Sequence, residues 1–227
     1  MAGSAAGVAG RARTIRRRLL IWGVAHYQRF AWRDETDPWL TLVAEVMLQR
    51  TRAVQAERAF GLFKERYPRA ETFAAASDAE VSEATAGLGL HWRGPMLRET
   101  AQAIAANGGA PPENEAALRR LPGVGPYAAA AWLSLHRGRR AVIVDNNVAR
   151  WLCRMAGVAY TAETRRQRWL WELADSLTPR RGFREYNCAV LDFTMLLCRP
   201  GVPACGECPL RSECQFALSL PGAARKT

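Results

Sequence analysis

The chain has 227 residues, a formal net charge of +11 and a sequence pI of about 10.1. This length suffices for one compact domain or two small lobes with hydrophobic cores. No apolar run approaches the roughly 20 residues needed to cross a bilayer, which excludes a membrane-spanning protein. The first ten residues lack a basic start, so we expect no secretory signal and a cytoplasmic protein. The positive charge favours a polyanionic partner, although arginine-rich codon usage on a solvated surface would produce the same excess.

The sequence predicts an almost entirely helical protein. Small residues lead into Arg11, Arg13, Arg16, Arg17 and Arg18, which predicts a disordered basic arm over residues 1–14. These arginines either contact phosphates or lie on the exposed face of a first helix. Apolar spacing and helix start signals predict helices over 15–27, 38–50, 51–66, 70–73, 78–86, 94–106, 114–119, 127–135, 146–155, 161–176 and 184–197. Glycine and proline predict loops at 108–112 and 137–138.

A glycine-rich segment, LPGVG at residues 121–125, lies between two predicted helices. Gly123 and Gly125 tolerate backbone angles that side chains forbid, so peptide N–H groups can converge on one point. The next helix directs the positive end of its dipole toward the same loop. The segment therefore predicts a phosphate-binding hairpin; a plain helix–helix turn is the alternative.

Four cysteines near the C-terminus have the spacing C-x6-C-x2-C-x5-C and are Cys198, Cys205, Cys208 and Cys214. In an arginine-rich chain without a secretory signal, such a group indicates metal ligands before disulfides. Four thiolates suit either a structural zinc ion or a [4Fe–4S] cluster. Zinc sites usually contain two CxxC pairs, and only Cys205 and Cys208 form one here, so the spacing favours the cluster.

These motifs carry a family resemblance. LPGVGPY at 121–127, IVDNNVARW at 143–151 and the cysteine motif resemble the helix-hairpin-helix DNA glycosylases that bear an iron–sulfur cluster. FAWR at 30–33, DPW at 37–39 and EVMLQRT at 45–51 are similar to the mismatch-specific branch. That branch contains adenine glycosylases acting at A/G mismatches and thymine glycosylases acting at G/T mismatches. The resemblance covers roughly residues 15–216.

The resemblance implies two helical lobes with a DNA cleft between them. The cluster lobe would comprise residues 15–37 and 141–216, and a six-helix barrel with the helix-hairpin-helix would comprise 38–140. Residues 217–227 would form a flexible tail. The implied partner is double-stranded DNA with a mismatched or damaged base, bound by a monomer associated with the nucleoid.

Asp145 is the predicted catalytic carboxylate, because breaking the bond between base and sugar places positive charge on the sugar. Capping of the following helix is its structural alternative. Glu45 interrupts an apolar helix, and a buried, partly protonated glutamate can donate a proton to the departing base. Alternatively, it pairs with Arg33 or Arg52. The resemblance assigns Asn147 a supporting contact at the sugar or water, and Tyr127 a place in the nucleotide pocket beside Asp145; a buried aromatic is the alternative for Tyr127.

Lysine usage bears on the reaction type. Relatives that also cut the DNA backbone use a lysine nucleophile just after the hairpin, where this chain has Tyr127. The only lysines are Lys64 and Lys226. We therefore expect a monofunctional enzyme that hydrolyses the base off and leaves an abasic site.

The target base is predicted to be thymine or uracil opposite guanine. Arg50 stands where adenine glycosylases usually have a second glutamine, and residues 87–93 lack the paired tyrosines common in those enzymes. The chain also ends soon after the cysteines, whereas adenine glycosylases usually continue into another domain. Adenine opposite guanine or 8-oxoguanine is the alternative, since Gln49 and Tyr127 occur in adenine enzymes as well.

A target base must leave the duplex before it can react, so we expect base flipping. Side chains that would fill the gap and probe the opposite base are Gln49, Arg50 and Leu90. Further predicted DNA contacts are Trp32 and Arg33 near the pocket, Gly123 and Gly125 at a phosphate, and Arg211 in the cysteine loop. The rival class is a non-catalytic, structure-specific DNA-binding protein, which would need neither Asp145 nor Glu45.

Overall fold

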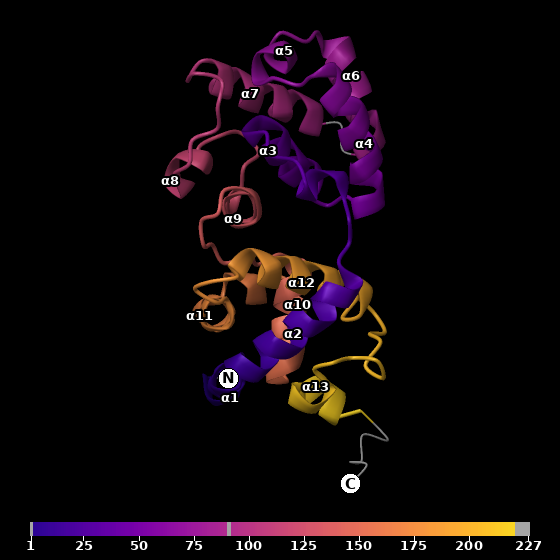
Figure 1. Ribbon diagram of the computed structural model, residues 1–227, viewed down its shortest axis with the longest axis vertical. Helices are drawn as coiled ribbons and strands as arrows, with labels where there is room; N and C mark the ends of the chain where they lie inside the picture. Colours follow the sequence, from indigo (N-terminus) through magenta and orange to yellow (C-terminus); the bar gives the residue numbers. More distant parts are fainter. Residues whose placement is uncertain (1, 90–91, 221–227) are drawn as a thin grey trace. The chain divides into compact units, whose positions relative to one another are not determined.

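The computed structural model describes residues 2–89 and 92–220, and every regular element in these ranges is helical. The predicted all-helical fold is confirmed. The chain is divided into two compact units (Figure 1). The cysteine unit comprises Met1–Gln28 and Arg140–Thr227, and the hairpin unit comprises Arg29–Arg139. No described helix has both the length and the apolar character needed to span a membrane.

The cysteine unit contains two chain segments that pack on one another. Its elements are α1 (Ala2–Gly10), α2 (Ala12–His26), α10 (Asn146–Ala156), η4 (Thr164–Arg166), α11 (Arg168–Leu177), α12 (Phe183–Leu196), η5 (Arg211–Glu213) and α13 (Gln215–Leu218). Helices α2 and α12 are far apart in the sequence but run side by side (Figure 1). The rings of Trp22 and Phe193 meet edge to face, with centroids 5.6 Å apart. Burial of these aromatic surfaces holds the two segments together.

The N-terminus differs from the prediction of a disordered arm over 1–14. Residues Ala2–Gly10 form helix α1, and Ala12 begins α2. Ala5 and Val8 are buried, and α1 packs against α10 and α11. Alanine has the highest helix propensity, and these two apolar side chains give the helix a surface to cover.

Three arginines of the basic run bind the cysteine unit itself. Arg11 forms an ion pair with Glu213, with Nε 2.9 Å from the carboxylate. Arg18 donates to the carbonyl of Pro209 at 3.1 Å, and Arg16 donates to the carbonyl of Leu177 at 2.9 Å. The run therefore fastens the cysteine loop and the end of α11, in addition to any contact with phosphates.

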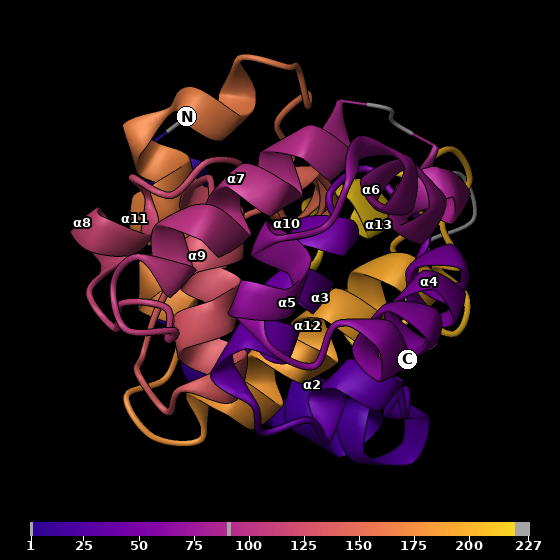
Figure 2. The same cartoon turned by 90° about the horizontal axis from the view of Figure 1, so that it is seen from above.

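The hairpin unit is continuous in sequence. Its elements are η1 (Ala31–Arg33), α3 (Pro38–Met47), α4 (Ala53–Arg66), α5 (Ala70–Ala74), α6 (Asp78–Thr85), η2 (Ala86–Leu88), α7 (Arg93–Ala105), α8 (Glu115–Leu118), α9 (Pro126–Ala131) and η3 (Trp132–His136), a π-helical turn. Helices α5 and α6 both pack against α7 (Figure 2). Residues 29–37, expected in the other lobe, belong here because η1 contacts α3 and α4.

Several element bounds differ from the sequence prediction. Helix α3 ends at Met47, before 50, because Arg50 has a φ of 57°, which no α-helix accommodates. The helix expected over 161–176 is divided into η4 and α11 by the extended backbone of Gln167. Of the expected tail, Ala217 and Leu218 belong to α13, and residues 221–227 lie outside the described residues.

Candidate active site and cysteine centre

Asp145 begins α10 in the cysteine unit. Its Oδ1 accepts a hydrogen bond from the backbone N–H of Val148 at 2.7 Å, so the predicted helix cap is present. Its Oδ2 accepts from the Asn147 side-chain amide at 2.9 Å. Burial raises the pKa of Asp145, and these hydrogen bonds oppose the shift. The carboxylate is therefore held in one orientation and only partly solvated, as a group that stabilises a developing cation should be.

A chain of polar contacts leads from Asp145 to the cysteine loop. Arg150 Nη2 donates to Asn147 Oδ1 at 3.0 Å and to the carbonyl oxygen of Cys198 at 3.2 Å. One helical turn later, Arg154 Nη1 donates to the same carbonyl at 3.2 Å. Helix α10 thus begins at the Asp145 carboxylate, and its arginines Arg150 and Arg154, further along the helix, bind the loop at Cys198.

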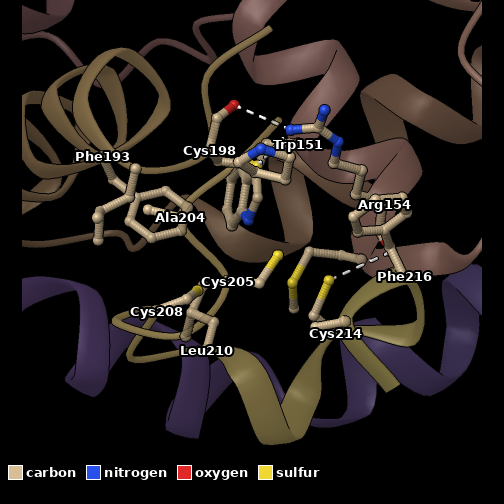
Figure 3. A pocket seen from close by; sticks show the side chains of 14 residues that line it. Trp151, Arg154, Phe193, Cys198, Ala204, Cys205, Cys208, Leu210, Cys214 and Phe216 are labelled. Carbon is tan, nitrogen blue, oxygen red and sulfur yellow. Dashed lines mark hydrogen bonds between the residues drawn. The ribbon is translucent and has the colours of Figure 1, made fainter. Parts of the chain in front are cut away.

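The four cysteines gather around one cavity (Figure 3). None forms a disulfide: Cys198, Cys205, Cys208 and Cys214 all have free thiols. The wall is largely apolar, with Trp151, Phe193 and Leu210 among its members. Burial raises the pKa of Cys208 to about 12, so this thiol does not ionise unaided near neutral pH.

Charged and polar groups also reach the sulfur atoms. Arg154 Nη1 donates to Cys198 Sγ at 3.4 Å, and Cys214 Sγ donates to the Arg154 carbonyl at the same distance. A guanidinium beside a sulfur stabilises the thiolate, which is the form that binds metals. Within the described ranges, no three His, Cys, Asp or Glu side chains are arranged to hold a single metal ion.

Glu45 lies in α3 of the hairpin unit and is 1% exposed. Its Oε1 is 3.0 Å from Nε2 of His136, whose side chain is 2% exposed. Among the residues that the structure describes, neither Glu45 Oε2 nor His136 Nδ1 has a hydrogen-bond partner. The alternative that Glu45 pairs with an arginine is wrong for Arg52, which donates to Gln55 instead, at 3.3 Å. The buried Glu–His pair is a place where a proton can be held in the hairpin unit.

The hairpin joins α8 to α9 with Gly123 at a φ of 73°. This positive φ favours glycine, and a Cβ built on Gly123 would also lie 2.7 Å from Met96 Sδ, so the Met96 side chain would have to move. Gly125 caps α9 and has open space where its Cβ would be. Gln49 reaches the hairpin from the turn after α3, and its side-chain amide donates to the Gly123 carbonyl at 2.8 Å. Two of the predicted DNA-contacting segments are thus joined directly.

Other predicted residues have varied environments. Arg50 is exposed, with a φ of 57°, and Arg211 is exposed in η5. Trp32 is 3% exposed and stacks on Phe30 with centroids 4.7 Å apart, which gives it a packing role in its unit. Arg33 is also buried, and its guanidinium lies over the Phe30 ring. Tyr127, the second residue of α9, is half-buried, and Leu90 lies outside the described residues.

Sequence reasoning missed three residues. His136 pairs with Glu45, Arg150 links Asn147 to Cys198, and Arg93 is fully buried and donates to the Gln49 carbonyl. A histidine directly after the apolar run Trp132–Leu135 was a weak signal for a buried ring. The four-residue spacing of Arg150 and Arg154 on an otherwise apolar helix was a stronger one, because it places both on one face. Arg93 gave no signal, since a buried arginine without an acidic partner is rare.

Comparison with known proteins adds the family. The model of the HhH-GPD superfamily base excision DNA repair protein matches residues 43–175. Thymine-DNA glycosylase from Aeropyrum pernix is 35% identical over 214 residues, which cover 91% of this chain and 96% of that protein. Human adenine DNA glycosylase is 34% identical over 208 residues, 87% of this chain but 38% of the human protein.

A solved structure agrees with this assignment. A thermostable thymine-DNA glycosylase matches with a TM-score of 0.86 at 29% identity, covering 93% of this chain and 98% of the other. The match spans nearly the whole of both chains, so the described helices follow the arrangement of that fold. The protein belongs to the HhH-GPD superfamily of base excision DNA repair proteins.

Proposed function

We propose that the protein is a DNA glycosylase that flips out thymine or uracil mispaired with guanine and hydrolyses its bond to the sugar. The observation that carries this proposal is the Asp145 carboxylate, held by Val148 and Asn147 at the start of α10 and partly desolvated. The thymine-DNA glycosylase from Aeropyrum pernix and the thermostable enzyme of the solved structure support the choice of base.

The chemistry follows from the charge that develops on the sugar. The bond from C1′ to the base nitrogen breaks, and its electron pair leaves with the base. The ionised carboxylate of Asp145 stabilises the resulting cation, which is worth more at a desolvated site than in water. A water oxygen then bonds to C1′ and passes its proton to Asp145. Asn147 acts on this step by keeping the carboxylate in place.

The departing base needs a proton or a hydrogen bond, which we assign to Glu45. His136 contacts one oxygen of this carboxyl group, while its other oxygen has no partner. The oxygen without a described partner is the one that could hydrogen-bond a departing base, which is the contact that proton donation requires. Protonation of a purine by the same group is the alternative, and it would make the protein an adenine glycosylase; the match to human adenine DNA glycosylase favours testing it.

We expect no strand cleavage. Lys64 forms an ion pair with Glu35 on the surface of the hairpin unit, and Lys226 lies outside the described residues. The position that follows the hairpin carries Tyr127, which cannot form a Schiff base. Borohydride trapping on abasic DNA should therefore give no covalent complex; a trapped complex would identify a bifunctional enzyme.

We further propose that the four cysteines hold a [4Fe–4S] cluster. Four free thiols around one cavity supply the donor set, and an adjacent guanidinium favours their ionisation. A tetrahedral zinc site requires sulfur atoms about 3.8 Å apart, given Zn–S bonds of about 2.3 Å. The six- and five-residue gaps around the single CxxC pair, Cys205 and Cys208, favour the larger group. When bound, the cluster would brace the loop; iron and acid-labile sulfide analysis tests it against zinc.

The experiment that tests the function is single-turnover excision on duplexes with G/T, G/U, A/G and A/8-oxoguanine pairs, followed by alkali to cut abasic sites. We expect the strand that contains thymine or uracil to be cut, and only after alkali treatment. Cleavage at adenine would identify the alternative enzyme. Binding of mismatched duplexes without any cleavage would favour the rival class, a non-catalytic DNA-binding protein.

A further inference from the structure

Arg93, at the start of α7, is fully buried and has no carboxylate partner among the described residues. Its side chain is 0% exposed. Nη1 donates to Thr51 Oγ1 at 2.6 Å and to the Met47 carbonyl at 3.2 Å, and Nη2 donates to the Gln49 carbonyl. Burial, with a smaller effect of Arg50, lowers the pKa of this guanidinium. A charge buried at such cost indicates that its hydrogen bonds have a specific purpose.

These acceptors lie at the last residue of α3, Met47, and in the turn that joins α3 to α4. This turn contains Arg50, the one non-glycine residue with a positive φ among those described, at 57°. The left-handed conformation costs a residue with a side chain about 1 kcal/mol or more, and it persists only where neighbours enforce it. Gln49 and Thr51 flank Arg50, and Arg93 binds the carbonyl oxygen of the first and the hydroxyl oxygen of the second. The guanidinium thereby holds Arg50 in its strained conformation with its side chain in solvent.

The same helix also supports the hairpin. Met96 packs where a side chain on Gly123 would lie, and Thr100 donates a hydrogen bond to the Pro122 carbonyl. Arg93, Met96 and Thr100 are spaced by three and four residues, so they lie along one face of α7. One rigid helix thus fixes both the Arg50 turn and the glycine hairpin, and the bond from Gln49 to Gly123 joins the two.

We propose that Arg93 is a positioning residue for recognition of the base opposite the target. It keeps the Arg50 turn at a fixed distance from the phosphate-binding hairpin, so that Arg50 meets the opposite base while the hairpin holds the backbone. An arginine can make two hydrogen bonds to guanine, which depend on its placement. This inference rests on the proposed function and goes beyond it by assigning the discrimination between opposite bases to a buried residue that touches no DNA.

The test is the ratio of single-turnover excision rates for thymine opposite guanine and thymine opposite adenine. Arg93→Lys keeps the charge, but its single nitrogen cannot reach all the acceptors that Arg93 binds through two separate nitrogens. We expect the ratio to fall about tenfold, the effect of losing one to two hydrogen bonds. Affinity for matched duplex should stay within about twofold, because such binding depends on phosphate contacts. Arg98→Lys is the matched control: Arg98 lies on the same helix but binds Ala76 and Asp78, so its ratio should stay at the wild-type value.

Thr51→Val provides a second variant if Arg93→Lys fails to fold. It removes one acceptor of Arg93 with little change in shape, and its ratio should fall about threefold, as for one hydrogen bond. The proposal would be overturned if a folded Arg93→Lys or Thr51→Val protein had the same ratio of excision rates as wild type. It would also be overturned if the ratio fell as much in Arg98→Lys as in Arg93→Lys. If the wild-type protein excises no base at all, the proposed function fails, and this inference fails with it. Excision by wild type with unchanged ratios in the variants rejects the inference alone.

Discussion

The guanidinium of Arg150 is bonded to the carbonyl oxygen of Cys198, and the same nitrogen donates to Asn147. Asn147 in turn donates to Asp145. The position of the proposed catalytic carboxylate therefore depends on the loop that contains the first of the four cysteines. A loop whose first cysteine is 53 residues from Asp145 in the sequence can therefore affect the reaction through this chain of hydrogen bonds.

Replacing Arg150 should weaken both ends of this connection. Arg150→Met keeps much of the apolar side chain but removes the bonds to Asn147 and Cys198, and excision should slow about tenfold, the effect of losing hydrogen bonds from a charged group. Arg168→Met is the control, because Arg168 is exposed and forms an ion pair with Glu172 on its own helix. The measurement is the single-turnover rate of preparations with the same iron content per protein. Equal rates for wild type and Arg150→Met would show that the connection has no role in catalysis.

Asp145→Asn should separate catalysis from structure. Asparagine caps a helix as well as aspartate does, so the fold and mismatch binding should remain. Without the negative charge, excision should fall by about 100- to 1000-fold. Binding to a mismatched duplex and excision are measured on the same preparation. A loss of binding as large as the loss of excision would mean that Asp145 is structural.

The pH dependence of excision should reflect the burial of Asp145. Because burial raises the pKa of this carboxyl group, it takes up a proton at a higher pH than an ordinary aspartate does. Excision, which needs the ionised form, should therefore decline earlier as the pH falls. The measurement is the single-turnover rate at a series of pH values.

The same shift has the opposite sign for stability. The folded state binds this proton more readily than the unfolded chain does. The contribution of Asp145 to the free energy of unfolding should therefore increase as the pH falls through the raised pKa. The contribution should vanish in Asp145→Asn, which cannot titrate. Denaturant unfolding of both proteins over the same pH range tests this, and parallel stability curves would contradict it.

Removing one partner of the buried Glu45–His136 pair should lower the free energy of unfolding more than replacing the carboxyl group with an amide. His136→Phe leaves the carboxyl group without its partner and should cost about 3 kcal/mol in the free energy of unfolding. Glu45→Gln keeps the contact with His136 and should cost less, yet it should slow excision because an amide cannot donate a carboxyl proton. Urea unfolding and single-turnover rates measure the two effects. Equal excision by Glu45→Gln and wild type would exclude a proton-donating role.

The parts of the site that could be predicted from sequence are those fixed by local rules. Asp145 follows an apolar run and begins a helix, so its capping role is visible in the sequence, as are the glycines of the hairpin. The spacing of the four cysteines indicates a common centre, and the structure gathers them around one cavity.

Contacts between distant segments could not be predicted in this way. His136 meets Glu45 across 91 residues, and Arg93 meets Gln49 across 44. Nothing in a helical pattern specifies which polar side chain finds which acceptor in a core. The N-terminal helix was missed for a related reason: its alanines and glycines resemble a linker until Ala5 and Val8 pack on α10 and α11.

The division of the cysteine unit into two segments has a consequence for the order of events during synthesis. The hairpin unit, residues 29–139, is continuous in sequence, so its own helices can pack on one another once it has left the ribosome. Helix α2 emerges before it but packs on α12, which ends at Leu196. The apolar face of α2, with Ile15, Leu19 and Trp22, therefore lacks its partner α12 while more than a hundred intervening residues are synthesised. Exposed apolar surface of this kind is prone to aggregation until its packing partner has been made.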